Sequence, residues 1–278
     1  MPSTGAAGTI ALHHLTIPSE GGSPLIIEGP QALTSREPLK NPPIHEAVLD
    51  VRVLASSDVS AASFEPLIRE IAGEFPQSKR MNAFAAEFAF GKGAPTTRRA
   101  ERKPLGHLFE SVDKKHILQF RVDGFTLSRL RPYEGFDGLY SLFERYWQMY
   151  LECAKPRGVV RLATRYINRF DVPPAGTIED HLTVFPSPPL AALSVTQFVH
   201  RTQYRNLKTN LNAGVVIALE PALDGKASTI VIDIDAYAGG SFECDLQTLG
   251  TKFRSLRMFK DDLFFAIVGP RALERFDQ

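Results

Sequence analysis

Residues 159–170 carry an arginine at every fourth position among mostly apolar, aromatic and small side chains, which predicts a β-strand with two distinct faces. On such a strand Arg161, Arg165 and Arg169 lie on the same face; we call these three residues the arginine row. A row of guanidinium groups needs carboxylates, phosphates or water opposite it, because an unpaired charge is costly to remove from water. We therefore expect the functional site on this strand.

Alternation and turn-forming residues predict further strands elsewhere in the chain, whereas apolar residues spaced three or four positions apart predict helices. The expected strands are 45–54, 81–90, 105–112, 116–131, 159–170, 192–204, 214–222 and 228–236. The expected helices are 64–75, 136–154, 245–267 and a last short one over 271–276. A capping-box-like sequence at Thr177–Asp180 predicts one additional short helix.

Three strands follow one another without intervening helices in each half of the chain, which excludes a doubly wound parallel sheet. Both halves run strand, connection, three strands, helix. We predict an α+β fold of antiparallel sheets with helices packed on one face, built from two pseudo-equivalent β-α-β-β-β-α-like halves. A pair of sheets and one continuous sheet both agree with this order.

Composition and the order of expected elements divide the chain into three parts. Residues 1–40 are rich in Gly, Ser, Pro and Thr, and predict a flexible N-terminal arm. Residues 41–157 form the first α+β half and residues 158–278 the second, and the two halves together can make one continuous domain.

The charge balance limits the class of partner. Lys and Arg total 32 against 31 Asp and Glu, a net charge of +1, which argues against extensive nucleic-acid binding. No stretch approaches the roughly 20 apolar residues of a membrane span, and the N-terminus lacks the pattern of a signal peptide. Cys153 and Cys244 have no C-x-x-C spacing and predict free thiols in a reducing cytoplasm.

The arginine row has an acidic counterpart on the strand predicted over 228–236. We expect the ligand-binding residues to be Arg161, Arg165, Arg169, Tyr166, Asn168, Asp233 and Asp235. Glu46, Asp50 and Arg52 form another polar face on the first strand. These charges can simply pair across strands of a solvated sheet, or they can line a cavity for an anionic or zwitterionic ligand. We expect Arg165, at the strand centre, to be the most buried arginine of the row.

Motifs for catalysis and cofactor binding are missing from the sequence. It contains no Walker loop, G-x-G-x-x-G or G-x-S-x-G pattern, and its histidines lack zinc-ligand spacing. Asp233 and Asp235 could approach a divalent cation, but no third carboxylate stands at a fitting spacing. We predict no metal and no cofactor.

Three short motifs resemble a sporadically distributed bacterial and archaeal family of uncharacterised proteins. They are Asn41-Pro42-Pro43-Ile44-x-Glu46-Ala47, Arg165-Tyr166-Ile167-Asn168-Arg169 and Gly269-Pro270-x-Ala272. The resemblance covers residues 41–278, and departs from the family at Val268-Gly269-Pro270, where an isoleucine-threonine-aspartate-like turn is common. The patchy distribution implies lateral transfer, as for defence or accessory genes. The resemblance implies no catalytic residues.

We predict a non-catalytic cytoplasmic binding or interaction protein, accessory or defence-linked, whose charge-lined sheet face takes an anionic ligand or a protein partner. The alternative is a Mg²⁺-dependent enzyme acting on a nucleotide or another phosphorylated substrate. In that case the arginine row would clamp the phosphates, and Asp233 and Asp235 would hold the metal ion.

Overall fold

The computed structural model describes residues 39–85, 101–172, 177–190, 192–221 and 227–278. Residues 37–278 form one compact unit. The predicted N-terminal arm lies almost entirely outside the described residues.

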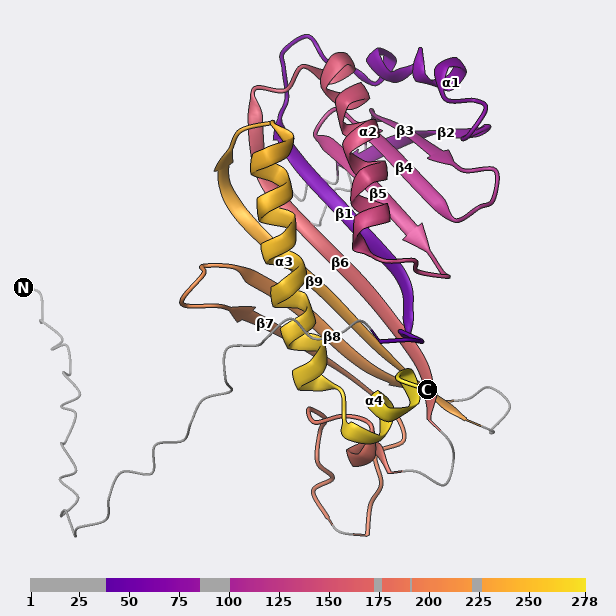
Figure 1. The fold of residues 1–278 in the computed structure, drawn as a ribbon, viewed down its shortest axis with the longest axis vertical. Coiled ribbons are helices and arrows are strands. Elements are labelled where there is room, and N and C mark those ends of the chain that lie inside the picture. The colour runs from indigo at the N-terminus through magenta and orange to yellow at the C-terminus, as the bar shows by residue number, and fades with distance from the viewer. Residues whose placement is uncertain (1–38, 86–100, 173–176, 191, 222–226) are drawn as a thin grey trace, which may run out of the picture. The chain divides into compact units, whose positions relative to one another are not determined.

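In the described part of the chain, nine strands form a single antiparallel sheet in the order β2-β3-β4-β5-β1-β6-β9-β8-β7 (Figure 1). The strands of the first half are β1 (Ile44–Leu54), β2 (Gln77–Ala85), β3 (Glu101–Glu110), β4 (His116–Arg121) and β5 (Gly124–Leu130). Those of the second half are β6 (Gly158–Val172), β7 (Phe198–Arg205), β8 (Asn212–Glu220) and β9 (Ser228–Phe242). Of the two arrangements that the sequence allows, the continuous sheet is the one formed.

The two halves have the same strand order, read outward from the β1–β6 pair at the centre of the sheet. In the first half β1 pairs with β5, which leads outward to β4 and β3, and in the second half β6 pairs with β9, which leads outward to β8 and β7. Strand β2 adds an edge to the first half only. The predicted pseudo-equivalent halves are therefore confirmed, and the antiparallel β1–β6 pair joins them.

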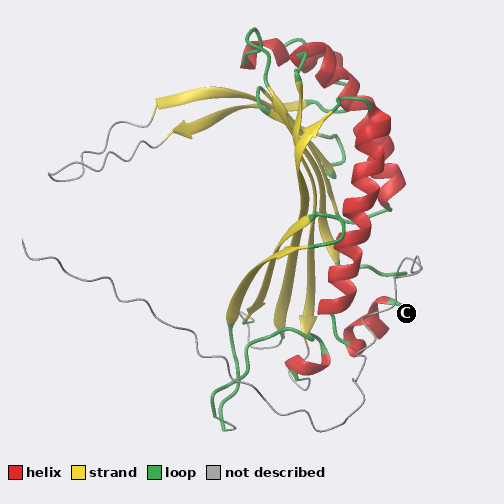
Figure 2. Ribbon diagram, turned by 90° about the vertical axis from the view of Figure 1, so that its left-hand side faces the viewer, coloured by secondary structure: helices red, strands yellow, loops and turns green. Residues whose placement is uncertain are grey.

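Two long helices cover one face of the sheet (Figure 2). They are α2 (Phe136–Ala154), which ends the first half, and α3 (Leu246–Ile267), which ends the second. The short α1 (Leu67–Glu70) and α4 (Pro270–Phe276) and two 3-10 turns, Ala61–Phe64 and Ile178–Asp180, complete the described helical structure. We call the face opposite α2 and α3, which is concave in Figure 2, the open face.

The core lies between the sheet and the long helices, because alternate strand residues are apolar on that side. Phe125 on β5 is fully buried and contacts aromatic rings on α2. Two aromatic residues of α2 donate hydrogen bonds to backbone oxygens. Tyr150 donates to the carbonyl oxygen of Arg121 (3.0 Å), and the indole of Trp147 donates to that of Cys244 (2.9 Å). These two groups are thus paired inside a mostly apolar layer.

The helix bounds of α2 agree with the sequence prediction, and α3 begins one residue later than expected. The helix predicted over 64–75 is wrong in extent: it consists of a 3-10 turn, the four residues of α1 and further turns. Pro66 accounts for the interruption, since it has no N–H to continue the hydrogen-bond ladder. The short helix predicted after Thr177 is confirmed, and the Thr177 N–H donates to Asp180 Oδ2 (3.4 Å).

The strand predicted over 116–131 is in fact two strands, β4 and β5, joined by a turn at Val122 and Asp123. Gly124 completes this turn, and a Cβ atom there would lie 2.1 Å from the carbonyl oxygen of Val51. Strand β7 begins only at Phe198, and β9 continues to Phe242 because it pairs with β6 along that whole length. The predicted segment 86–90 lies outside the described residues.

No helix in the described segments is long and apolar enough to cross a membrane.

We expect Phe125→Ala to lower the free energy of unfolding by about 3–5 kcal/mol, because it leaves a cavity among tightly packed rings. Met258→Ala on α3 is the control: its side chain is 64% exposed, so the change should stay within about 0.5 kcal/mol. Urea unfolding of both variants checks this, with the m-value unchanged. Equal effects at the two positions would show that the sheet–helix interface is not the core.

Candidate functional site

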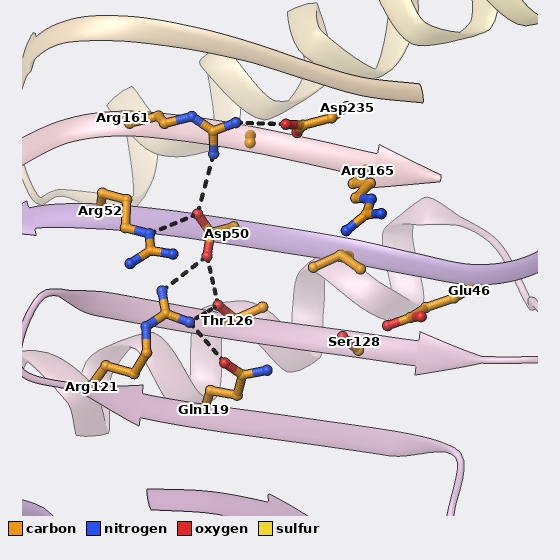
Figure 3. Close-up of a pocket in the computed structure, with 12 residues that line it drawn as sticks. Glu46, Asp50, Arg52, Gln119, Arg121, Thr126, Ser128, Arg161, Arg165 and Asp235 are labelled. Atoms are coloured by element: carbon orange, nitrogen blue, oxygen red, sulfur yellow. Dashed lines mark hydrogen bonds and ion pairs between the residues drawn. The ribbon is translucent and has the colours of Figure 1, made fainter. Parts of the chain in front are cut away.

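The open face carries the charged side chains of the central strands. On β1 the buried residues Leu49 and Val51 point toward the helices, whereas Asp50 and Arg52 point to the open face. A pocket of about 530 Å³ opens on this face over β4, β5, β1, β6 and β9 (Figure 3). It is lined by Glu46, Val48, Asp50, Arg52, Gln119, Arg121, Thr126, Ser128, Arg161, Ala163, Arg165 and Asp235.

Asp50 is the centre of a charged network in the pocket. Its Oδ1 accepts from Arg121 Nη2 (3.0 Å) and from the Thr126 hydroxyl (2.6 Å). Its Oδ2 lies 3.3 Å from Arg161 Nη1 and 3.4 Å from Arg52 Nε. One carboxylate on β1 therefore binds side chains from β4, β5 and β6 as well as its own strand.

Arg121 is the most buried arginine of this network, with 4% of its side chain exposed. Its Nε donates to Asp123 Oδ1 (3.1 Å), and its Nη1 donates to Gln119 Oε1 (2.9 Å) and Thr126 Oγ1 (2.6 Å). With the bond to Asp50, each nitrogen of this guanidinium has an acceptor. Such complete pairing is what a buried charge requires.

The two carboxylates of the network respond differently to their surroundings. Burial raises the pKa of Asp50, but the charges of Arg121 and Arg52 and the Thr126 hydrogen bond outweigh it, so the net pKa is lowered. Burial also raises the pKa of Asp235, and there Arg161 and Arg165 do not compensate, so the net pKa is raised. Of these two carboxylates, Asp50 is the one whose negative charge its surroundings stabilise.

The arginine row lies on the open face, as expected, but its burial differs from the prediction. The exposed fraction of the side chain is 30% for Arg161, 48% for Arg165 and 45% for Arg169. The expectation that Arg165 is most buried is therefore wrong. Arg161 is more covered because it lies over the Tyr237 ring (4.7 Å to the centroid) and beside Asp50, a clustering that sequence position does not reveal.

Each arginine of the row meets a carboxylate on the second half. Arg165 binds Asp233 through Nε to Oδ1 (2.8 Å) and Nη2 to Oδ2 (2.6 Å). Arg161 Nη2 donates to Asp235 Oδ2 (2.8 Å). The acidic counterpart inferred from the sequence is thus in contact with the row.

Arg169 lies outside the residues that line the pocket, and its Nη2 donates to Glu220 Oε2 on β8 (2.6 Å). The structure also separates Tyr166 and Asn168 from the row. Both are buried on the helix side, where Tyr166 meets the Tyr133 hydroxyl (2.9 Å) and Asn168 donates to the carbonyl oxygen of Ile232 (3.1 Å). Their side chains support the fold rather than the pocket.

Sequence reasoning missed Arg121, Gln119, Thr126 and Ser128 as pocket residues. Had the Asp123-Gly124 pair been treated as a turn, β4 and β5 would have emerged as separate strands. Alternation along each of them then places Gln119 with Arg121, and Thr126 with Ser128, on one face. The signal was present in the sequence.

Among the described residues no group of three or more His, Cys, Asp or Glu side chains is placed to hold a metal ion. Cys153 and Cys244 are free and half-buried, and burial raises the pKa of both thiols. A raised thiol pKa lowers the fraction of reactive thiolate at neutral pH.

Comparison with known proteins found no matching family model and no matching curated protein. The resemblance to a bacterial and archaeal family stays a hypothesis.

We expect Asp50→Asn to lower the free energy of unfolding at pH 7 by about 3 kcal/mol, because it leaves the buried Arg121 charge undercompensated. Asp235→Asn, a control in the more exposed pair with Arg161, should change it by no more than about 1 kcal/mol. Because the pKa of Asp50 is lowered in the folded protein, its contribution is present above pH 3.8 and lost as the pH falls further.

Urea unfolding between pH 3 and pH 7 measures both effects, and the difference between wild type and Asp50→Asn should shrink at the acid end. A constant difference across that range would contradict the assignment of Asp50 as the ionised centre.

Proposed function

We propose that this chain is a non-catalytic binding protein whose open-face pocket takes a small ligand through an anionic group. The observation that carries the proposal is the state of Arg165. Its guanidinium uses Nε and Nη2 to bind Asp233, and within the described part of the chain its Nη1 makes no hydrogen bond. The side chain is about half exposed and lines the pocket.

A carboxylate or phosphate oxygen of a ligand can accept from this free Nη1 while the pair with Asp233 stays intact. Charge-assisted hydrogen bonds of this kind are stronger than neutral ones and are directional. The other three arginines of the lining are less suited to bind a ligand, because each already contacts two protein carboxylates; they are Arg52, Arg121 and Arg161. Arg165 is therefore the anchoring residue that we propose.

The pocket is also organised before any ligand arrives. Asp50 holds side chains from four strands in one arrangement, so little side-chain freedom remains to be lost on binding. A volume of about 530 Å³ falls within the range of small-molecule sites. Both properties favour a small ligand over a flat contact with a protein.

The Mg²⁺-dependent enzyme remains the alternative hypothesis, and the pocket favours it less. Asp233 and Asp235, its expected metal ligands, each accept from an arginine. A metal ion would have to displace both guanidinium groups, which would then face the incoming cation. As to location, the two free cysteines fit a reducing compartment, and we propose the cytoplasm.

We expect a panel of small carboxylates and phosphates to contain compounds that raise the melting temperature of the wild type, because binding to the folded state stabilises it by mass action. Arg165→Gln should weaken that binding about ten-fold or more, equivalent to about 1.4 kcal/mol. The matched control is Arg169→Gln, on the same strand and face, similarly exposed and ion-paired but outside the pocket lining; its affinity should equal that of the wild type.

Equal shifts in wild type and Arg165→Gln for every compound would refute the proposal. A parallel screen of nucleotides with and without Mg²⁺ tests the alternative. A Mg²⁺-dependent shift that disappears in Asp233→Asn would favour the enzyme.

A further inference from the structure

We infer that the ligand is zwitterionic, an amino acid or a close analogue, with its carboxylate at Arg165 and its ammonium group at Glu46. This inference rests on the proposed function and specifies the ligand of the same pocket.

Strand register places the relevant side chains around one point on β1. Val48 pairs with Ser128 on β5 and with Arg165 on β6, so these two polar residues flank it on either side. Glu46 lies two residues from Val48 on the same strand, and therefore on the same face. Figure 3 places Glu46, Ser128 and Arg165 together at one end of the pocket, apart from the Asp50 network.

Hydrogen-bonding groups are free at this end and mostly paired at the other. Around Asp50, the Thr126 hydroxyl, the Arg121 guanidinium and Gln119 Oε1 are engaged with one another or with Asp50. By contrast, in the described parts of the chain the Glu46 carboxylate, the Ser128 hydroxyl and Arg165 Nη1 take part in no hydrogen bond, although the charges of Glu46 and Arg165 interact. An acceptor, a hydroxyl and a cationic donor thus face the same space.

The part of the sheet beneath Glu46, Ser128 and Arg165 is apolar. Val48, which is partly exposed, lies there between Ser128 and Arg165. Carbon atoms of a ligand can contact Val48 while its polar groups reach the surrounding side chains. The combination of an apolar floor and a few convergent polar groups is typical of small-ligand sites.

Charge balance favours a zwitterion over a simple anion. The four arginines of the lining are met by Glu46, Asp50 and Asp235 in the lining and by Asp123 and Asp233 beside it. A simple anion would place a second negative charge near Glu46 without compensation. A zwitterion brings an ammonium group to that carboxylate and adds no net charge to the pocket.

The test measures binding of the twenty standard amino acids and 4-aminobutanoate by isothermal titration calorimetry. Each compound that binds is compared with its counterpart lacking the amino group and its counterpart lacking the carboxyl group. We expect at least one zwitterion to bind the wild type about ten-fold more tightly than either counterpart.

Two variants separate the contributions. Glu46→Gln should weaken the zwitterion about ten-fold and leave the counterpart without an amino group unchanged or tighter, whereas Arg165→Gln should weaken both. Glu220→Gln is the matched control, because Glu220 pairs with Arg169 on the open face outside the pocket lining. Urea unfolding verifies that each variant is folded.

The failures of the two proposals are distinguishable. If no amino acid binds, or if Glu46→Gln binds zwitterions as the wild type does, the zwitterion inference is overturned; the proposed function survives wherever simple anions still bind through Arg165. If no compound of either panel binds through Arg165, both are overturned.

Discussion

The antiparallel pairing of β1 with β6 is the interaction on which the rest of the structure depends. It joins the two halves into one sheet, and its register sets which side chains meet. Because side chains alternate along a strand, the same register directs Leu49 toward α2 and α3 and Asp50 toward the open face. A slip by one residue would bury the charges and expose the core, so the apolar face fixes the polar one.

The open face is stabilised by pairing of charges, whereas the core is stabilised by apolar packing. Its charges are not covered by helices, and they lie too close together to remain unpaired. Asp50 resolves this by binding arginines from both halves, Arg121 on β4 and Arg161 on β6. Buried ion pairs of this kind add little net stability, because desolvation offsets their attraction, but they specify one arrangement. That rigidity prepares the neighbouring end of the pocket for recognition.

The sequence was most informative where structure is local. The periodicity of 136–154 and 245–267 located both long helices, since their apolar stripes repeat within a few residues. The β4–β5 turn was missed although the buried apolar positions change phase across it, from Leu118 and Phe120 to Phe125 and Leu127. The burial of Arg161 could not be predicted, because it depends on Tyr237 and Asp50, which arrive from strands distant in the chain.

The pocket is formed where the two halves meet, and their central strands carry different charged residues there. Strand β1 brings Glu46 and Asp50 to the open face, and its counterpart β6 brings Arg161 and Arg165. Two identical strands at this junction would place like charges side by side, which is destabilising. In the actual register Arg52 pairs directly with Arg161, and the Asp50 carboxylate offsets their repulsion because it contacts both guanidinium groups. Each half contributes part of the polar lining, so the free Glu46 carboxylate and the free Arg165 nitrogen come together at the junction of the halves.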